Sequence, residues 1–275
     1  MEVIFTLFLE PLSHPFMQRA LIAAIFIGVS CAIFSCYLIL KGWSLMGDAV
    51  SHSVLPGIAI AYVINIPLII GAFISGLFCA LLTGYLSAHT RIKEDAVMGI
   101  LFSGMFGLGI VMLSKIETDI HLLHVLFGNI LGISSSDLIQ SIIIISLCAS
   151  LMLIKRRDLF LYCFDPAHAQ VIGIPVKWLS ITLLCLLSLT IVSSLKAAGI
   201  ILVIAMLIAP GATGFLLSNS FDRMMGISII TALSSGVTGT LLSYHFDTAT
   251  APLIVIIQAS LFLMALLISK TSKQH

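Results

Sequence analysis

The chain has 275 residues, of which 60% are hydrophobic and only 9% are charged, and its formal net charge at pH 7 is +1. Ordinary soluble domains carry roughly 25% charged residues, so this composition excludes a soluble globular protein. The near-neutral balance gives no basic patch and no indication of a nucleic-acid partner.

Apolar runs long enough to cross about 30 Å of hydrocarbon as helices recur along the whole chain, and the alternating segments of a membrane β-barrel are absent from the sequence. We therefore predict an all-α fold, a polytopic transmembrane helical bundle that forms one domain over residues 1–275 with eight or nine spans. The expected spans are residues 16–40, 48–64, 68–88, 96–114, 138–154, 177–195, 199–217, 224–243 and 251–268. The shorter piece at 122–133 is predicted to lie at the membrane surface or to dip in and return.

Lysine and arginine residues set the orientation, because they collect on the cytoplasmic side. If all nine segments cross, ten basic residues share one side, against Arg19, Lys115 and Lys196 on the other. If 48–64 only dips in, Arg19 and Lys41 exchange sides and the count is again ten against three. The ten are Lys41, Arg91, Lys93, Lys155, Arg156, Arg157, Lys177, Arg223, Lys270 and Lys273. The charges therefore fix the orientation from residue 68 onward and leave the N-terminus open.

Small residues recur at every fourth position in two spans, which lets helix backbones approach closely in lipid and favours a compact bundle. The two stripes are Gly71, Ser75, Cys79, Thr83 and Ser87, and Gly99, Ser103 and Gly107. The six cysteines are scattered without a CxxC pair, so we expect them to fill helix interfaces.

The stretch GDAVSHSVLPG, residues 47–57, places Asp48 and His52 four residues apart, so on a helix they share one face. A carboxylate within the membrane costs at least about 2.5 kcal/mol, and such residues usually face a cavity, pair with another group or mark an ion path. One carboxylate and one imidazole suit a divalent ion such as Mn²⁺, Fe²⁺ or Zn²⁺. Gly47 and Pro56-Gly57 weaken the regular helix, as expected where backbone lines a pocket. The alternative is that Asp48 caps a helix at the interface.

Two further polar segments interrupt the apolar runs. KIETDIHLLH, residues 115–124, could attract a cation at the mouth of a path, with His124 nearest the apolar run, or it could be a solvated loop. In KRRDLFLYCFDPAHAQVIGIPVKW, residues 155–178, Asp165-Pro166 predicts a helix start and Gly173 its end. A short helix here would be a docking element, and the alternative is an ordinary connecting loop.

Five stretches in order resemble the membrane subunits of bacterial ABC importers for manganese, iron and zinc, the ABC-3 family. They are LKGWSLMGDAVSHSVLPGIA (40–59), RIKEDAVMGI (91–100), LLHVLFGNIL (122–131), FDPAHAQVIGIP (164–175) and ILVIAMLIAPGAT (201–213). The resemblance implies the fold of vitamin B12 and siderophore permeases and a multi-pass place in the bacterial cytoplasmic (inner) membrane. It also implies nine crossings with the N-terminus outside.

The resemblance further implies that Asp48 and His52 coordinate the metal, and that 164–175 is a cytoplasmic coupling helix that docks on an ABC ATPase subunit. Asp165, Ala169 and Gly173 match that element, whereas Ala167 and His168 depart from the family pattern. The partners implied are the ATPase, a metal-binding delivery protein, a second permease copy or sister subunit, and membrane lipid.

We therefore predict a transmembrane permease of an ATP-driven importer that passes a divalent metal to the cytoplasm. The chain has no GxxxxGK[ST] loop, so we expect it not to be an enzyme and ATP hydrolysis to occur on a separate subunit. No cofactor is expected to be bound permanently, since the metal is the cargo. The alternative is a secondary, proton-coupled metal transporter in which Asp48 and His52 relay protons.

Overall fold

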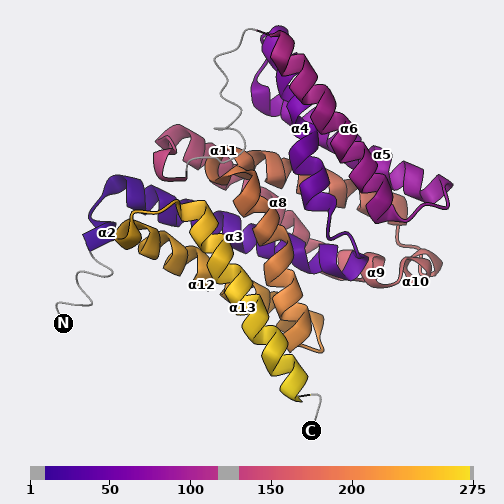
Figure 1. Ribbon diagram of the computed structural model, residues 1–275. Coiled ribbons are helices and arrows are strands. Elements are labelled where there is room, and N and C mark those ends of the chain that lie inside the picture. Colours follow the sequence, from indigo (N-terminus) through magenta and orange to yellow (C-terminus); the bar gives the residue numbers. More distant parts are fainter. Residues whose placement is uncertain (1–9, 117–129, 273–275) are drawn as a thin grey trace.

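The computed structural model describes residues 10–116 and 130–272, and every regular element within them is a helix (Figure 1). These are α2 (Glu10–Leu12), α3 (Pro15–Lys41), α4 (Met46–Val63), α5 (Leu68–His89), α6 (Glu94–Lys115), η2 (Ile130–Gly132), α8 (Ser135–Ile154), α9 (Arg156–Phe164), α10 (Pro166–Val171), α11 (Val176–Leu217), α12 (Phe221–Phe246) and α13 (Thr250–Ser272). Among the described helices, seven are long and apolar enough to cross a membrane: α3, α5, α6, α8, α11, α12 and α13. The all-α, polytopic prediction is therefore confirmed, and most of the predicted piece at 122–133 lies outside the described residues.

Helix α11 is two helices joined end to end. Gly199 interrupts its 42 residues with φ 77° and ψ 167°, a conformation that favours glycine. Before the break, Lys196 pairs with Asp137 at the start of α8. After it, Ser218 lines a cavity with Phe160 of α9, so the chain has turned back. The sequence predicted this division as two spans, 177–195 and 199–217.

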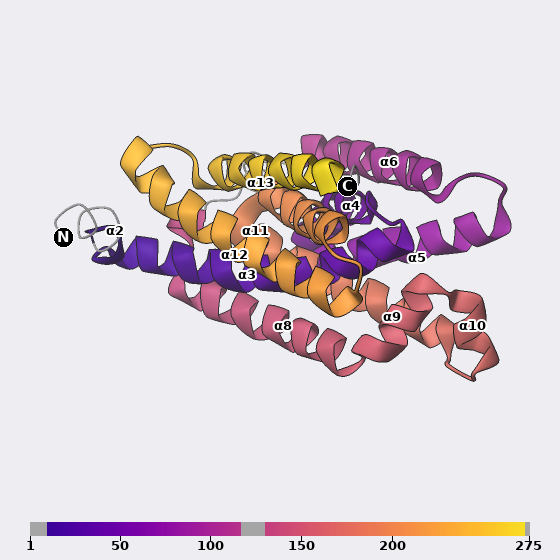
Figure 2. The same ribbon diagram turned by 90° about the horizontal axis from the view of Figure 1, so that it is seen from below.

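Polar contacts define two ends of the bundle, which we call the α9 end and the α2 end. At the α9 end, the Trp43 indole N–H donates to the Glu94 carboxylate at 2.8 Å, and Lys41 Nζ lies 4.5 Å from the centre of the Tyr162 ring. At the α2 end, Arg19 donates to the Ile133 carbonyl at 3.1 Å. Figure 2 shows α2 and α9 at opposite ends.

These contacts separate the two basic residues whose sides the charge count left open. Arg19 belongs to the α2 end and Lys41 to the α9 end. Helix α4 starts next to the α9 end, and Pro67, which follows it, lines a cavity together with Lys196 of the α2 end. Helix α4 therefore runs from one end of the bundle to the other, over about 27 Å for its 18 residues.

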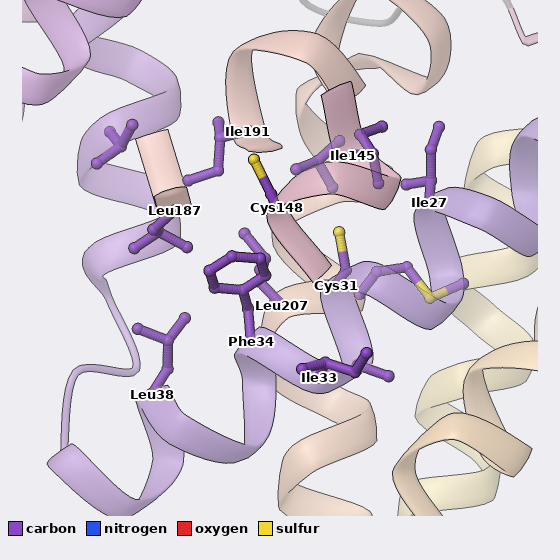
Figure 3. Packing of buried hydrophobic residues seen from close by; sticks show 14 of the residues in the cluster. Ile27, Cys31, Ile33, Phe34, Leu38, Ile145, Cys148, Leu187, Ile191 and Leu207 are labelled. Atoms are coloured by element: carbon purple, nitrogen blue, oxygen red, sulfur yellow. The ribbon is translucent and has the colours of Figure 1, made fainter. Parts of the chain in front are cut away.

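Helix α3 forms the centre of the core. Its apolar window is 72% buried, compared with 22% for α6 and for α13. Figure 3 shows Cys31 and Phe34 of α3 among Ile145 and Cys148 of α8 and Ile191 of α11. Because α6 and α13 are covered so little, they present apolar surface to lipid or other subunits, and exposed apolar side chains of α5 and α8 add to it.

Helix α4 packs unusually close to α5 and α6, and glycines permit this. A methyl group at Gly57 would overlap the Gly71 carbonyl of α5, and one at Gly109 of α6 would overlap Leu55. Gly47 and Pro56-Gly57, which we expected to weaken the regular helix, all lie inside the continuous helix α4, from which Pro56 removes one backbone donor. At Gly57 and Gly109 the missing side chain lets the helix backbones approach closely, as small residues do in membrane helix bundles.

The first stripe of small residues packs as predicted, whereas the glycines of the second meet no neighbouring helix in the described part of the chain. Ser75 of α5 donates to the Ser53 carbonyl of α4 at 2.6 Å. By contrast, a methyl group at Gly99 or Gly107 of α6 would meet nothing within 4 Å. The spacing identifies a smooth helix face, but it does not identify what covers that face.

Candidate functional site

The side chains of Asp48 and His52 contact each other on one face of α4. The distance from His52 Nε2 to Asp48 Oδ1 is 3.2 Å, and the side chains are 24% and 28% exposed, respectively. The two groups lie within the first two turns of α4, close to the α9 end. The predicted i,i+4 contact is therefore present, and both groups are partly accessible.

The alternative role of Asp48 as a helix cap is wrong. Leu45 occupies the N-cap position of α4 and makes no side-chain cap hydrogen bond, and Asp48 lies inside the first turn. A carboxylate in the first turn interacts favourably with the positive end of the helix dipole. The helix therefore stabilises the negative charge of Asp48 but leaves its oxygens available for other partners.

The His52 ring packs against two aromatic side chains of α6. Its centre lies 5.0 Å from that of Phe106 in an edge-to-face arrangement and 5.8 Å from that of Phe102. The Nδ1 atom of His52 is buried and has no hydrogen-bond partner among the residues that the structure describes. A buried polar atom without a partner is costly, so this nitrogen marks a place where a ligand would gain binding energy.

Pro56 changes the hydrogen bonding of the same turn. Proline has no backbone N–H, so the His52 carbonyl, four residues earlier in α4, loses its usual α-helical donor. The imidazole, the Asp48 carboxylate and this carbonyl oxygen all belong to one turn and a half of helix. Together they offer a metal ion one type of nitrogen ligand, the imidazole, and two types of oxygen ligand, the carboxylate and the carbonyl.

The described residues contain no group of three or more His, Cys, Asp or Glu side chains that could hold a metal. Asp48 and His52 thus stand as a pair among the residues placed by the structure. His124, together with Glu117, Asp119 and His121, lies outside the described residues. The predicted role of His124 therefore stays a prediction.

The segment after α9 forms a short helix, α10, at the α9 end of the bundle. Asp165 caps it by accepting from the His168 backbone N–H at 2.9 Å, with Pro166 in the first position. At its end, Gly173 has φ 84° and the Ile174 N–H donates to the Ala169 carbonyl at 3.0 Å. The predicted helix start and stop are confirmed.

Ala169 and Gly173 shape this element differently: Ala169 packs inside it, whereas Gly173 is exposed in the turn that ends it. Ala169 is fully buried, whereas Val171 is 84% and Ile172 is 55% exposed. The sequence analysis did not predict the exposure of Val171 and Ile172. The available signal was two successive apolar residues between a helix cap and a glycine. Phe164 and Trp178 extend the exposed apolar surface to both sides.

The comparisons with known proteins agree with this architecture. A model of the ABC 3 transport family matches residues 13–269. The chain is 59% identical over 267 residues to the chelated iron transport system membrane protein YfeD of Yersinia pestis, covering 97% of this chain and 90% of that protein. It is 50% identical over 258 residues to the manganese transport system membrane protein MntB of Synechocystis sp., covering 94% and 84%.

Two solved structures share the fold. PsaBC from Streptococcus pneumoniae, in complex with Fab, is 35% identical with a TM-score of 0.84, covering 95% of each chain. A metal-chelate type ABC transporter in an inward-facing conformation is 17% identical with a TM-score of 0.71, covering 90% of this chain and 85% of that one, which is a likeness of fold alone. From its matched length and these relatives, the chain belongs to the ABC 3 transport family: it is a multi-pass membrane permease subunit of an ABC transporter, and the ATPase is a separate component.

Proposed function

We propose that the chain is the permease of an importer that moves Mn²⁺ or Fe²⁺ into the cytoplasm, and that Asp48 and His52 bind the ion during its passage. The observation that carries the proposal is the pair itself, with Nε2 and Oδ1 3.2 Å apart and a second ring nitrogen that is buried and has no partner within the described chain. Manganese and iron are the metals named for the two relatives described above, so they come before zinc.

The donors of this turn suit transient binding. Carboxylate and carbonyl oxygens suit Mn²⁺, and imidazole suits Fe²⁺, so a mixed set accepts either ion. Two side chains do not fill the coordination shell of such an ion. The rest of the shell would come from water, from backbone oxygens such as that of His52, or from groups outside the described residues. Incomplete coordination keeps the ion from being trapped, which a transport site requires.

The proposed topology has nine crossings, with the N-terminus outside and the α9 end in the cytoplasm. It counts α4 and both halves of α11 as spans and follows from the alternation of the two ends along the chain. Nine of the ten basic residues that the sequence groups together lie in the described chain and fall at the α9 end, which matches the positive-inside rule. This arrangement is that of the vitamin B12 and siderophore permeases without their first span.

The ATPase subunit would dock on α10 and its surroundings. Val171 and Ile172 present exposed apolar side chains at the cytoplasmic end, where lipid cannot cover them. Asp165, Ala169 and Gly173 hold these two in place through the cap, the buried packing and the turn. A metal-delivery protein outside and a second permease copy, identical or related, would complete the transporter.

The test is metal uptake by the complete transporter in proteoliposomes. Asp48→Asn and His52→Ala should each lower uptake of Mn²⁺ or Fe²⁺ at least tenfold, while the complex still assembles. Asp95→Asn and His89→Ala are matched controls, because both residues are exposed at the cytoplasmic end of neighbouring helices. Uptake at the wild-type rate by both site variants would overturn the assignment.

A further inference from the structure

An apolar cavity of about 520 Å³ opens among α4, α5, α8 and α11, away from the Asp48–His52 pair. Val54 and Ile58 of α4 line it. Val54 follows His52 by two residues, which places it about 200° further round the helix. Because His52 faces Phe106 of α6, the cavity lies on the other side of α4 and does not belong to the proposed metal site.

The cavity has polar lining residues at the α2 end of the bundle and apolar lining residues further toward the middle of the bundle. Lys196, Gln140 and Pro67 line it at the α2 end, whereas Val54 and Val192 lie deeper. Val54 is nine residues from the end of α4 at Val63, or about 14 Å along the helix. That depth is about half of a hydrocarbon core roughly 30 Å thick. The cavity therefore spans about one leaflet, with its polar part at the level of the lipid headgroups.

An ion pair stands at the mouth. Lys196 lines the cavity and pairs with Asp137 of α8, and the two side chains are 47% and 29% exposed. An ammonium beside a carboxylate complements a headgroup that carries both signs, with the phosphate on Lys196 and a headgroup ammonium on Asp137. An anionic headgroup would instead bring its net negative charge next to Asp137, and a choline headgroup has no N–H to donate to it.

We propose that this cavity binds one phospholipid of the phosphatidylethanolamine type, with an acyl chain along α4 and the headgroup on the Lys196–Asp137 pair. The volume falls within the range of roughly 300–1,000 Å³ that small-molecule sites have. The inference uses the membrane orientation given under Proposed function, but it uses neither the metal nor the ATPase. Measuring bound lipid on the metal-free transporter therefore keeps its failure distinct from a failure of the metal assignment.

The experiment is native mass spectrometry of the purified complex, exchanged into detergent with phosphatidylethanolamine, phosphatidylglycerol or phosphatidylcholine. Wild type should retain one phosphatidylethanolamine per permease chain, at least tenfold more tightly than either other lipid. Leu68→Trp fills the cavity and Lys196→Ala removes the cation, and each should weaken retention at least tenfold. Asp137→Asn should abolish the preference over phosphatidylglycerol.

Two matched control variants distinguish lipid binding in this cavity from a general effect of the substitutions on lipid bound to the protein surface. Ile70→Trp adds the same ring on α5 at a residue that is 47% exposed, compared with 41% for Leu68, but does not line the cavity. Lys115→Ala removes an exposed lysine at the end of α6. Both should retain lipid within twofold of wild type. Equal retention of the three lipids, equal loss in the controls, or a disulfide between two permease copies through Leu68→Cys would overturn the proposal.

Discussion

At the scale of single residues, the His52 ring is held by two kinds of contact: aromatic side chains pack against it, and a carboxylate lies next to one of its nitrogens. Phe102 and Phe106 fix the plane of the ring, and Asp48 holds Nε2. In the proposed metal site, a ring fixed on these sides would lose little further freedom on coordination, which lowers the entropic cost of binding. The aromatic contacts would thus preorganise the imidazole.

The Cys163 thiol on α9, outside the spans, should be inert. Burial raises the pKa of Cys163 from 9.0 to about 12, and the charge of Lys41 offsets only part of this rise. A higher pKa means less thiolate, here about a thousandfold less below pH 9, and the thiolate is the nucleophile. At pH 8 we expect maleimide to leave Cys163 unmodified in the folded complex, as peptide mass spectrometry would reveal.

A cysteine at position 91 provides the comparison, because Arg91 is exposed in the turn between α5 and α6. Arg91→Cys should be labelled within minutes under the same conditions. Labelling of Cys163 at a similar rate would mean that α9 opens frequently.

The spacing of Asp48 and His52 was enough to predict their contact, since residues four apart on a helix are neighbours. Their aromatic surroundings could not be predicted, because Phe102 and Phe106 reach His52 only through the packing of α6 on α4. The exposed pair Val171 and Ile172 was missed although its place between a helix cap and a glycine was a signal, because in so apolar a chain hydrophobicity alone does not separate exposed from buried residues.

At the scale of helices, the predicted spans match the structure to within four residues at each boundary. Hydrocarbon thickness sets the length of a span and charged residues mark its ends, so the sequence contains both signals. What faces each helix is not encoded locally. Gly71 packs on α4 as its spacing suggests, whereas Gly99 has the same spacing and meets no neighbour in the described chain.

Gly57→Ala should destabilise the permease, because the methyl group would overlap the Gly71 carbonyl and force α4 away from α5. Overpacking of this kind costs about 1–3 kcal/mol. We expect a lower Tm of the purified complex. Gly84→Ala is the control, since nothing lies within 4 Å of the added methyl group and the helix propensity improves. An unchanged Tm for Gly57→Ala would show that the two helices separate freely.

Val171→Asp should weaken binding of the ATPase subunit at least tenfold, because it places a charge in the centre of an exposed apolar surface. Co-purification of the ATPase and its dissociation rate would measure this. Asn219→Asp adds the same charge at an exposed residue of the α11–α12 turn and should leave binding unchanged. Equal binding by both variants would remove α10 from the interface.

At the scale of the whole molecule, the proposed nine crossings would place the two ends of the chain on opposite sides of the membrane. The decisive element is α4, which is absent from the seven helices selected by hydropathy among the described residues. Asp48, His52 and several serines lower its mean hydropathy. The contacts at its two ends nevertheless show that it runs from one end of the bundle to the other.

Cysteine labelling decides this topology. Asn65→Cys, in the turn after α4, should react with a membrane-impermeant maleimide added outside, because the turn is exposed at the α2 end. Arg91→Cys, exposed in the turn between α5 and α6, should react only after permeabilisation. If α4 merely dips into the membrane, Asn65→Cys will behave like Arg91→Cys.

The reversal at Gly199 has a consequence for how the protein is made. Between residues 178 and 217 the only charged residue is Lys196, so the insertion machinery meets two apolar helices joined by a single glycine turn instead of a hydrophilic loop. In the proposed topology, such a hairpin carries one lysine across the bilayer. Asp137, which pairs with Lys196, belongs to a helix synthesised earlier, so the proposed order of insertion brings the carboxylate to that side before the lysine.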